Sequence, residues 1–129
     1  LTTSYSLARL MRSDKPEDRA VVEKVGVVFP NQNSWGTHVN IAGAAVARHA
    51  KNPANAVKFL EYLASPSAQN YFANGNNEWP VARGVTTDNP ALKAMTGGSG
   101  QFKSETIPIS AVGANQVKVQ QMLDRVGFK

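Results

Sequence analysis

The chain has 129 residues, of which 42 % are hydrophobic and 18 % are charged, a composition that indicates a globular domain and excludes a disordered segment. Lys and Arg exceed Asp and Glu by 14 to 9, but these basic residues are dispersed and form no block or helical stripe that would favour nucleic acid. The absence of cysteine excludes disulfides and thiolate metal sites. No apolar run reaches the roughly 18 residues of a membrane span. Because Leu1 is not an initiator Met and no signal peptide follows it, we expect a processed chain or a piece of a longer one.

The start of the chain is expected to be helical. Ser4 is a candidate N-cap for a short helix that begins at Tyr5. Pro16 suits the first position of a further helical turn, and the acidic residues Glu17 and Asp18 follow where negative charge is favourable. We therefore expect a short helix, a loop and a second helical turn.

Two short strands are expected next. Residues 25–29 (VGVVF) are apolar and rich in β-branched side chains, and Pro30 ends the run, which favours a buried strand. A polar turn covers residues 31–36. Residues 37–41 (THVNI) alternate between polar and apolar side chains, a pattern typical of a second strand.

The remaining elements are predicted to be helices separated by loops. Asn52 and Pro53 open the clearest helix, with Asn52 as its cap, and an apolar face follows at Ala56, Val57, Leu60, Leu63 and Ala64. Ser65 and Pro66 repeat the same start signal, and that helix is expected to end at residues 74–75. Residues 78–100 should be mostly loop with one helical turn around residues 91–95, and the last helix should cover residues 114–126. Two strands with several helices indicate an α/β fragment whose partner strands lie before Leu1, because doubly wound sheets have more strands.

Two stretches resemble the periplasmic ferric-iron-binding proteins, which are type II solute-binding proteins of ABC importers. They are residues 29–43 (FPNQNSWGTHVNIAG) and residues 51–81 (KNPANAVKFLEYLASPSAQNYFANGNNEWPV). Many type II solute-binding proteins carry a helix pair like that of the second stretch, so the first stretch is the one that points to iron. The resemblance extends over nearly the whole chain. It implies an α/β fold class: the C-terminal part of a two-lobe fold, here a helix-rich fragment with few strands.

The resemblance also implies a division of residues 1–129 between the lobes. Residues 1–25 would belong to one lobe, and residues 26–32 would be a strand that crosses between the lobes. Residues 33–100 would belong to the other lobe. Residues 101–129 would form a C-terminal return and helix.

The resemblance implies an iron ligand near the start of the chain. The family carries two adjacent tyrosines, an Asn two positions before the first of them, and an Arg a few residues later. Tyr5 aligns with the first tyrosine and Arg9 with the arginine, but Ser6 replaces the second tyrosine and Thr3 replaces the Asn. Ferric iron prefers hard anionic oxygen, and its charge makes a phenolate available, whereas a serine alkoxide forms far less readily. Tyr5 is therefore the predicted metal ligand, and Ser6 is a departure that weakens the site.

In this family a small anion often completes the iron shell, bound by backbone N–H groups and short polar side chains. Thr3, Ser4 and Ser6 are groups of that kind, and Arg9 is a candidate for a contact with the anion. Without the resemblance, Tyr5 is better explained as a half-buried aromatic residue than as a metal ligand, and the resemblance brings the two explanations to about equal weight. Arg9 is better explained as a member of an ion pair on the surface or between the lobes.

Two amides lie in the turn after the first predicted strand. Asn31 and Gln32 are candidates for the hinge between the lobes, because Asn and Gln side chains hold loop backbone in place. The alternative is that they face the cleft.

The implied function is a receptor that binds Fe(III) with a synergistic anion and delivers it to an ABC transporter permease. The expected location is the periplasm, or outside the membrane of a Gram-positive cell on an anchor. Its other partner would be the N-terminal portion of the same protein, and no nucleic acid is expected. Ser6 leaves open a receptor for another small polar or anionic solute. A hydrolase or transferase on an α/β sheet is a third reading, but no Gly-x-Ser-x-Gly elbow or paired carboxylate supports it, so we expect no enzyme.

Overall fold

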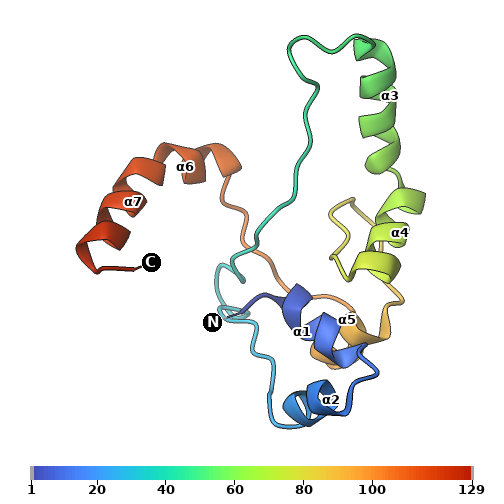
Figure 1. Ribbon diagram of the computed structural model, residues 1–129, viewed down its shortest axis with the longest axis vertical. Helices are drawn as coiled ribbons and strands as arrows, with labels where there is room; N and C mark the ends of the chain where they lie inside the picture. Colours follow the sequence, from blue (N-terminus) through green and yellow to red (C-terminus); the bar gives the residue numbers. More distant parts are fainter. Residues whose placement is uncertain (1, 129) are drawn as a thin grey trace. The chain divides into compact units, whose positions relative to one another are not determined.

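A computed structural model describes residues 2–128, and within this range all regular secondary structure is helical (Figure 1). The helices are α1 (Ser4–Met11), α2 (Pro16–Val22), α3 (Pro53–Leu63), α4 (Pro66–Asn76), α5 (Pro90–Met95), α6 (Ile109–Ala114) and α7 (Gln116–Arg125). The chain divides into two compact units. The first comprises Leu1–Phe29 with Asn40–Phe102, and the second comprises Pro30–Val39 with Lys103–Lys129.

Proline and short polar caps set the helix starts of the first unit. Helices α2 to α5 each have a proline in their first turn, where its missing N–H leaves no hydrogen bond unmade. The prediction of Ser4 as the first cap is wrong by one residue, because the Thr3 side chain accepts the hydrogen bond from the N–H of Ser6. Asn52 occupies the N-cap of α3 as expected, but its side chain makes no capping hydrogen bond.

Two of the predicted helices, the one that starts at Pro66 and the last one, have different bounds in the structure. Helix α4 continues to Asn76 and ends where Asn77 takes a left-handed conformation with φ of 57°. The last predicted helix is shorter, because α7 begins at Gln116, and a separate helix, α6, precedes it. Asn115 lies between α6 and α7 and serves as a cap of both helices.

Both strand predictions are wrong. Residues 25–29 and 37–41 contain no strand, and the β-pairing in this range is an isolated parallel bridge between Thr37 and Ser104. A strand exists only when a neighbouring strand accepts and donates its hydrogen bonds. Val28 is 85 % exposed, so the apolar run of residues 25–29 lacks such a neighbour in the described part of the chain.

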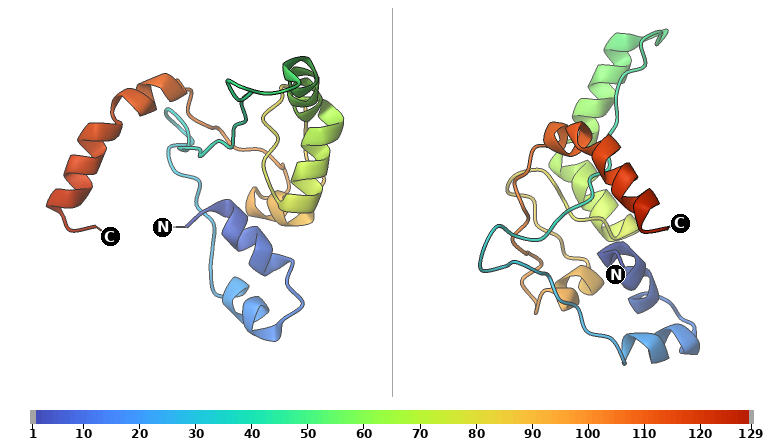
Figure 2. Two further views of the ribbon diagram at one scale, coloured as in Figure 1. Left: turned by 45° about the horizontal axis from the view of Figure 1, so that its top comes forward. Right: turned by 90° about the vertical axis from the view of Figure 1, so that its left-hand side faces the viewer.

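The core of the first unit lies between α1 and α5. Ala8 is fully buried on α1, and its small side chain lets α1 lie close beside α5, as the views in Figures 1 and 2 show. Leu92 is fully buried on α5. Partly buried apolar side chains surround this contact: Leu7, Met11, Phe29 and Trp79.

A buried amide connects α5 to the end of α4. Asn89 is 1 % exposed, and its side-chain oxygen accepts hydrogen bonds from the N–H groups of Ala91 and Leu92 at 2.9 and 3.3 Å. Its side-chain NH₂ donates to the carbonyl of Ala73 at 2.7 Å and to the side chain of Asn77 at 2.9 Å. Asn89 therefore caps one helix and satisfies the last turn of another.

The same network reaches α1 through Arg12, the residue that caps its C-terminal end. The guanidinium donates to the carbonyl of Asn74 at 2.6 Å and to the side-chain oxygen of Asn77 at 2.9 Å. The side-chain oxygen of Asn77 accepts hydrogen bonds from both Arg12 and Asn89. Because Asn77 is only 7 % exposed, the loss of either hydrogen bond would leave a buried polar group without a partner, which is costly.

The second unit is built on two passes of the chain that run side by side. The N–H of Thr37 donates to the carbonyl of Lys103 at 2.8 Å, and the N–H of Glu105 donates to the carbonyl of Thr37 at 2.9 Å. Gly36, with φ of 98°, allows this approach, because a Cβ there would lie 2.6 Å from the carbonyl carbon of Ser104.

We expect Asn89→Ala to lower the free energy of unfolding of the complete protein by about 2–3 kcal/mol, because several buried groups would lose their partner. Urea unfolding followed by circular dichroism measures this change. The matched control is Asn70→Ala at an exposed position of α4, which should change stability by less than about 0.5 kcal/mol. Equal stability of the two variants would contradict the network's importance.

Gly36→Ala should destabilise the protein by at least about 2 kcal/mol, since it adds both a left-handed alanine and a backbone clash. Gly43→Ala is the control, because a Cβ at Gly43 meets no heavy atom within 4 Å. Thermal unfolding of the two variants side by side tests this, and a Gly36→Ala protein as stable as the control would show that the close approach to Ser104 is absent.

Candidate functional site

Tyr5 lies in the first turn of α1, in the first unit. Its side chain is 38 % exposed, and the guanidinium carbon of Arg9, one turn later, lies 5.8 Å from the centre of its ring. This is the distance of a cation–π contact, which holds the ring in place from one edge of the helix. Within residues 2–128 the Tyr5 hydroxyl makes no hydrogen bond, so its oxygen is available to bind a ligand. The structure also brings the predicted ligand Tyr5 together with the predicted arginine, Arg9.

Thr3 and Ser6 hold the N-terminus of α1. The Thr3 hydroxyl accepts from the N–H of Ser6 at 3.3 Å, and the two side-chain oxygens lie 3.0 Å apart. Both residues are exposed. Two of the three predicted anion-binding hydroxyls, those of Thr3 and Ser6, therefore lie together at a helix start, where backbone N–H groups also point outward and favour negative charge.

Ser4 has a different partner. Its side-chain oxygen accepts a hydrogen bond from the indole N–H of Trp79 at 3.0 Å. This contact cannot be predicted from sequence, because the two residues lie 75 positions apart and no local pattern links them. The indole of Trp79 also lies against two aromatic rings, those of Phe29 and Phe102.

Asn31 and Gln32 lie in the second unit. Asn31 adopts φ of 60°, and its carbonyl accepts from the N–H groups of Ser34 and Gly36 at 3.0 and 2.9 Å, which closes the turn. The Gln32 side chain accepts from the N–H of Lys103 at 2.8 Å and donates to the carbonyl of the same residue at 2.9 Å. Gln32 thus pairs with Lys103 as a neighbouring strand would, and its assignment to the hinge or the cleft stays a prediction.

The acidic residues and histidines of the described part of the chain form no metal-binding cluster. Residues 2–128 contain no group of three or more His, Cys, Asp or Glu side chains that could hold a metal ion. His38 is hydrogen-bonded to Glu105. The hydrogen bond and the charge of Lys93 lower the pKa of Asp88, whose carboxylate is fully exposed. None of the helices within residues 2–128 has the length and hydrophobicity of a membrane span.

The chain matches known solute-binding proteins. Residues 5–96 match the family model described as bacterial extracellular solute-binding protein. Two Synechocystis proteins, Iron uptake protein A2 and Iron uptake protein A1, are 45 % and 38 % identical to it over its whole length. The chain spans only 36 % and 34 % of these relatives.

Solved structures agree with this match. A Trichodesmium protein (IdiA, FutA) in complex with iron and citrate is 50 % identical, with a TM-score of 0.89 over 99 % of this chain and 39 % of that one. Apo FutA2 from Synechocystis is 45 % identical, with a TM-score of 0.85 over 98 % of this chain and 39 % of that one. The ferric binding protein from Campylobacter jejuni is 35 % identical, with a TM-score of 0.81 over 98 % of this chain and 38 % of that one.

These likenesses confirm the expected fold class, a helix-rich part of a two-lobe type II periplasmic-binding-protein fold, although the strands expected within this part are not formed. They also agree with the expectation that the chain is not an enzyme, because the family is one of solute-binding proteins. The chain belongs to the bacterial extracellular solute-binding protein family.

Proposed function

We propose that the complete protein is a ferric-iron receptor of the periplasm that delivers Fe(III) to the permease of an ABC importer. The observation that carries this proposal is Tyr5, a tyrosine in the first turn of α1 whose hydroxyl has no hydrogen-bond partner within residues 2–128. It lies in a chain that is 45 % identical to a protein named for iron uptake.

The chemistry of Tyr5 fits a trivalent cargo. Ferric iron is a hard cation that binds anionic oxygen in preference to nitrogen or sulfur, and a metal-bound phenol loses its proton readily. One phenolate cannot fill the coordination shell. The proposal therefore places the remaining ligands in the larger part of the protein, since this chain spans about a third of its iron-uptake relatives.

An anion beside the iron is part of the proposal. The start of α1 offers backbone N–H groups, the hydroxyls of Thr3 and Ser6, and the positive charge of Arg9 near Tyr5. A helix N-terminus with such groups favours a carboxylate or similar anion. The Trichodesmium structure contains iron and citrate together, which supports a carboxylate as the chemical class.

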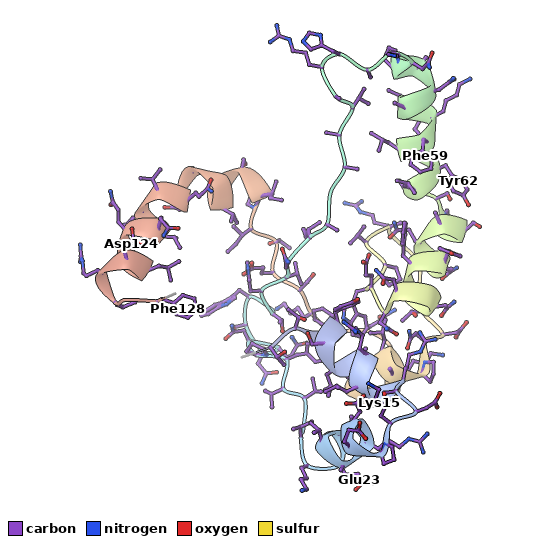
Figure 3. The ribbon with its side chains drawn as sticks, in the orientation of Figure 1. Lys15, Glu23, Phe59, Tyr62, Asp124 and Phe128 are labelled. Carbon is purple, nitrogen blue, oxygen red and sulfur yellow. The ribbon has the colours of Figure 1, made fainter. Side chains whose placement is uncertain are left out.

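Exposed apolar side chains on α3 and α7 support the proposal that further parts of the protein pack against this chain. On α3 the large side chains of Phe59 and Tyr62 are 60 % and 56 % exposed (Figure 3), and on α7 Val117 is 72 % exposed. Faces of this kind normally pack against other protein. We propose that the N-terminal portion of the same protein covers them.

The division of the chain between lobes stays a prediction. Residues 1–25 and 33–100 are assigned to different lobes, with residues 26–32 as a crossing segment and residues 101–129 as a return. The two hydrogen bonds between Gln32 and Lys103 tie residues 30–39 to the start of residues 103–129, which supports the assignment of this region as a connection.

A second candidate function is a receptor for another small anionic solute. Ser6 favours it, because this exposed serine stands where iron-binding relatives are expected to have their second phenolate, and its hydroxyl bonds to Thr3 instead. Colour separates the two candidates. A tyrosinate–iron complex absorbs visible light by charge transfer, whereas a receptor for an organic solute stays colourless when iron is added.

We expect the complete protein, stripped of metal, to develop this visible band when titrated with ferric citrate, and Tyr5→Phe to lose most of it. Iron affinity should fall by more than about 100-fold, because even partners outside the ligand shell contribute about 10–100-fold. The control is Tyr71→Phe at an exposed tyrosine of α4. A Tyr5→Phe protein that binds iron like this control would remove Tyr5 from the site.

Ser6→Tyr should strengthen iron binding by about tenfold or more and intensify the visible band, because it supplies a second phenolate beside Tyr5. Ser67→Tyr, at an exposed serine of α4, controls for the added aromatic ring. Equilibrium competition with citrate gives the affinities. Weaker binding in Ser6→Tyr than in the parent protein would show that this position does not face the metal.

A further inference from the structure

We propose that Trp79 is a positioning residue for Tyr5. Its indole N–H binds Ser4, the first residue of α1, and thereby fixes the start of the helix that carries Tyr5. The inference rests on the proposed function, because Tyr5 matters here as an iron ligand. Trp79 and Ser4 would align the Tyr5 phenolate without touching the metal themselves.

The contact is made directly beside the ligand. The indole N–H of Trp79 donates to the side-chain oxygen of Ser4 at 3.0 Å in a part-buried position, and Ser4 precedes Tyr5 in the first turn of α1. The other end of α1 is held by Arg12. Because the helix is only eight residues long, two such contacts limit how it can rotate or slide, and with it the phenol of Tyr5.

Trp79 is itself fixed by aromatic neighbours. Its ring meets that of Phe29 edge-on, with centroids 6.1 Å apart and planes at 83°, and that of Phe102 at 5.1 Å and 79°. Phe29 and Phe102 stack on each other at 4.4 Å with an angle of 14°. Edge-on and stacked aromatic pairs are favourable geometries, so the indole can direct its N–H with little freedom.

The two phenylalanines occupy special places along the chain. Phe29 is the last residue of the first unit before the chain passes into Pro30–Val39, and Phe102 is the last before it passes into Lys103–Lys129. Both rings that contact Trp79 therefore lie at the ends of segments of the first unit.

The test compares Trp79→Phe, which keeps an aromatic ring but removes the N–H, with Ser4→Ala, which removes the acceptor, both in the complete protein. We expect each to weaken ferric binding by about tenfold, at the lower end of the effect of partners outside a ligand shell. Each should also shift the wavelength of the tyrosinate–iron band, which reports the orientation of the phenolate. The double variant should be no weaker than either single variant, since both remove one interaction.

The controls separate positioning from a merely structural role. Trp35→Phe, at an exposed tryptophan of the second unit, and Ser67→Ala should leave both affinity and band unchanged. If Trp79→Phe and Ser4→Ala lower the melting temperature but bind iron with the parent's affinity and band, the inference is overturned.

Failure of the underlying function gives a different pattern. If the parent protein takes up no iron, or if Tyr5→Phe keeps the parent's band, the proposed function falls and takes the positioning role with it. If Tyr5→Phe loses the band while Ser4→Ala and Trp79→Phe keep parental affinity and wavelength, the positioning role alone is wrong. Should Trp79→Phe fail to fold, Ser4→Ala decides the question by itself.

Discussion

Helix α1 depends on hydrogen bonds that hold both of its ends to segments more than sixty residues later in the chain. At its C-terminal end Arg12 donates to the carbonyl of Asn74, 62 residues away, and at its first residue Ser4 accepts from Trp79, 75 residues away. An isolated helix of eight residues is not stable in water. The position of Tyr5 is therefore a property of the whole first unit.

The polar groups that hold this unit together are few and buried. Asn77, Thr87 and Asn89 are at most 7 % exposed, and Asn77 and Asn89 bond to one another. The apolar core beside them is small, with Leu92 as its largest fully buried side chain. In a unit with so little buried apolar surface, satisfied amide networks contribute much of the specificity of packing. This arrangement gives Tyr5, the proposed ligand, a defined position on a short helix.

Local signals predicted some elements well. Helix starts were recognisable because Pro53, Pro66 and the cap at Ser65 act within one turn of the chain, and the structure confirms these helices. The strand predictions are wrong, because a strand depends on a partner from any part of the sequence, and residues 25–29 have none within the described range. The Trp79–Ser4 contact could not be predicted from sequence for the same reason. Tyr5 and Arg9 came from resemblance, and the structure adds that Arg9 lies against the Tyr5 ring.

The central claim is that the Tyr5 phenolate binds Fe(III) on a helix whose start Trp79 holds. The most direct measurement is a crystal structure of the complete iron-loaded protein, with anomalous diffraction recorded at the iron edge. The account predicts an iron peak within bonding distance of the Tyr5 hydroxyl oxygen, with the indole of Trp79 still donating to Ser4. An iron peak bonded only to other residues, with Tyr5 outside its coordination shell, would contradict it.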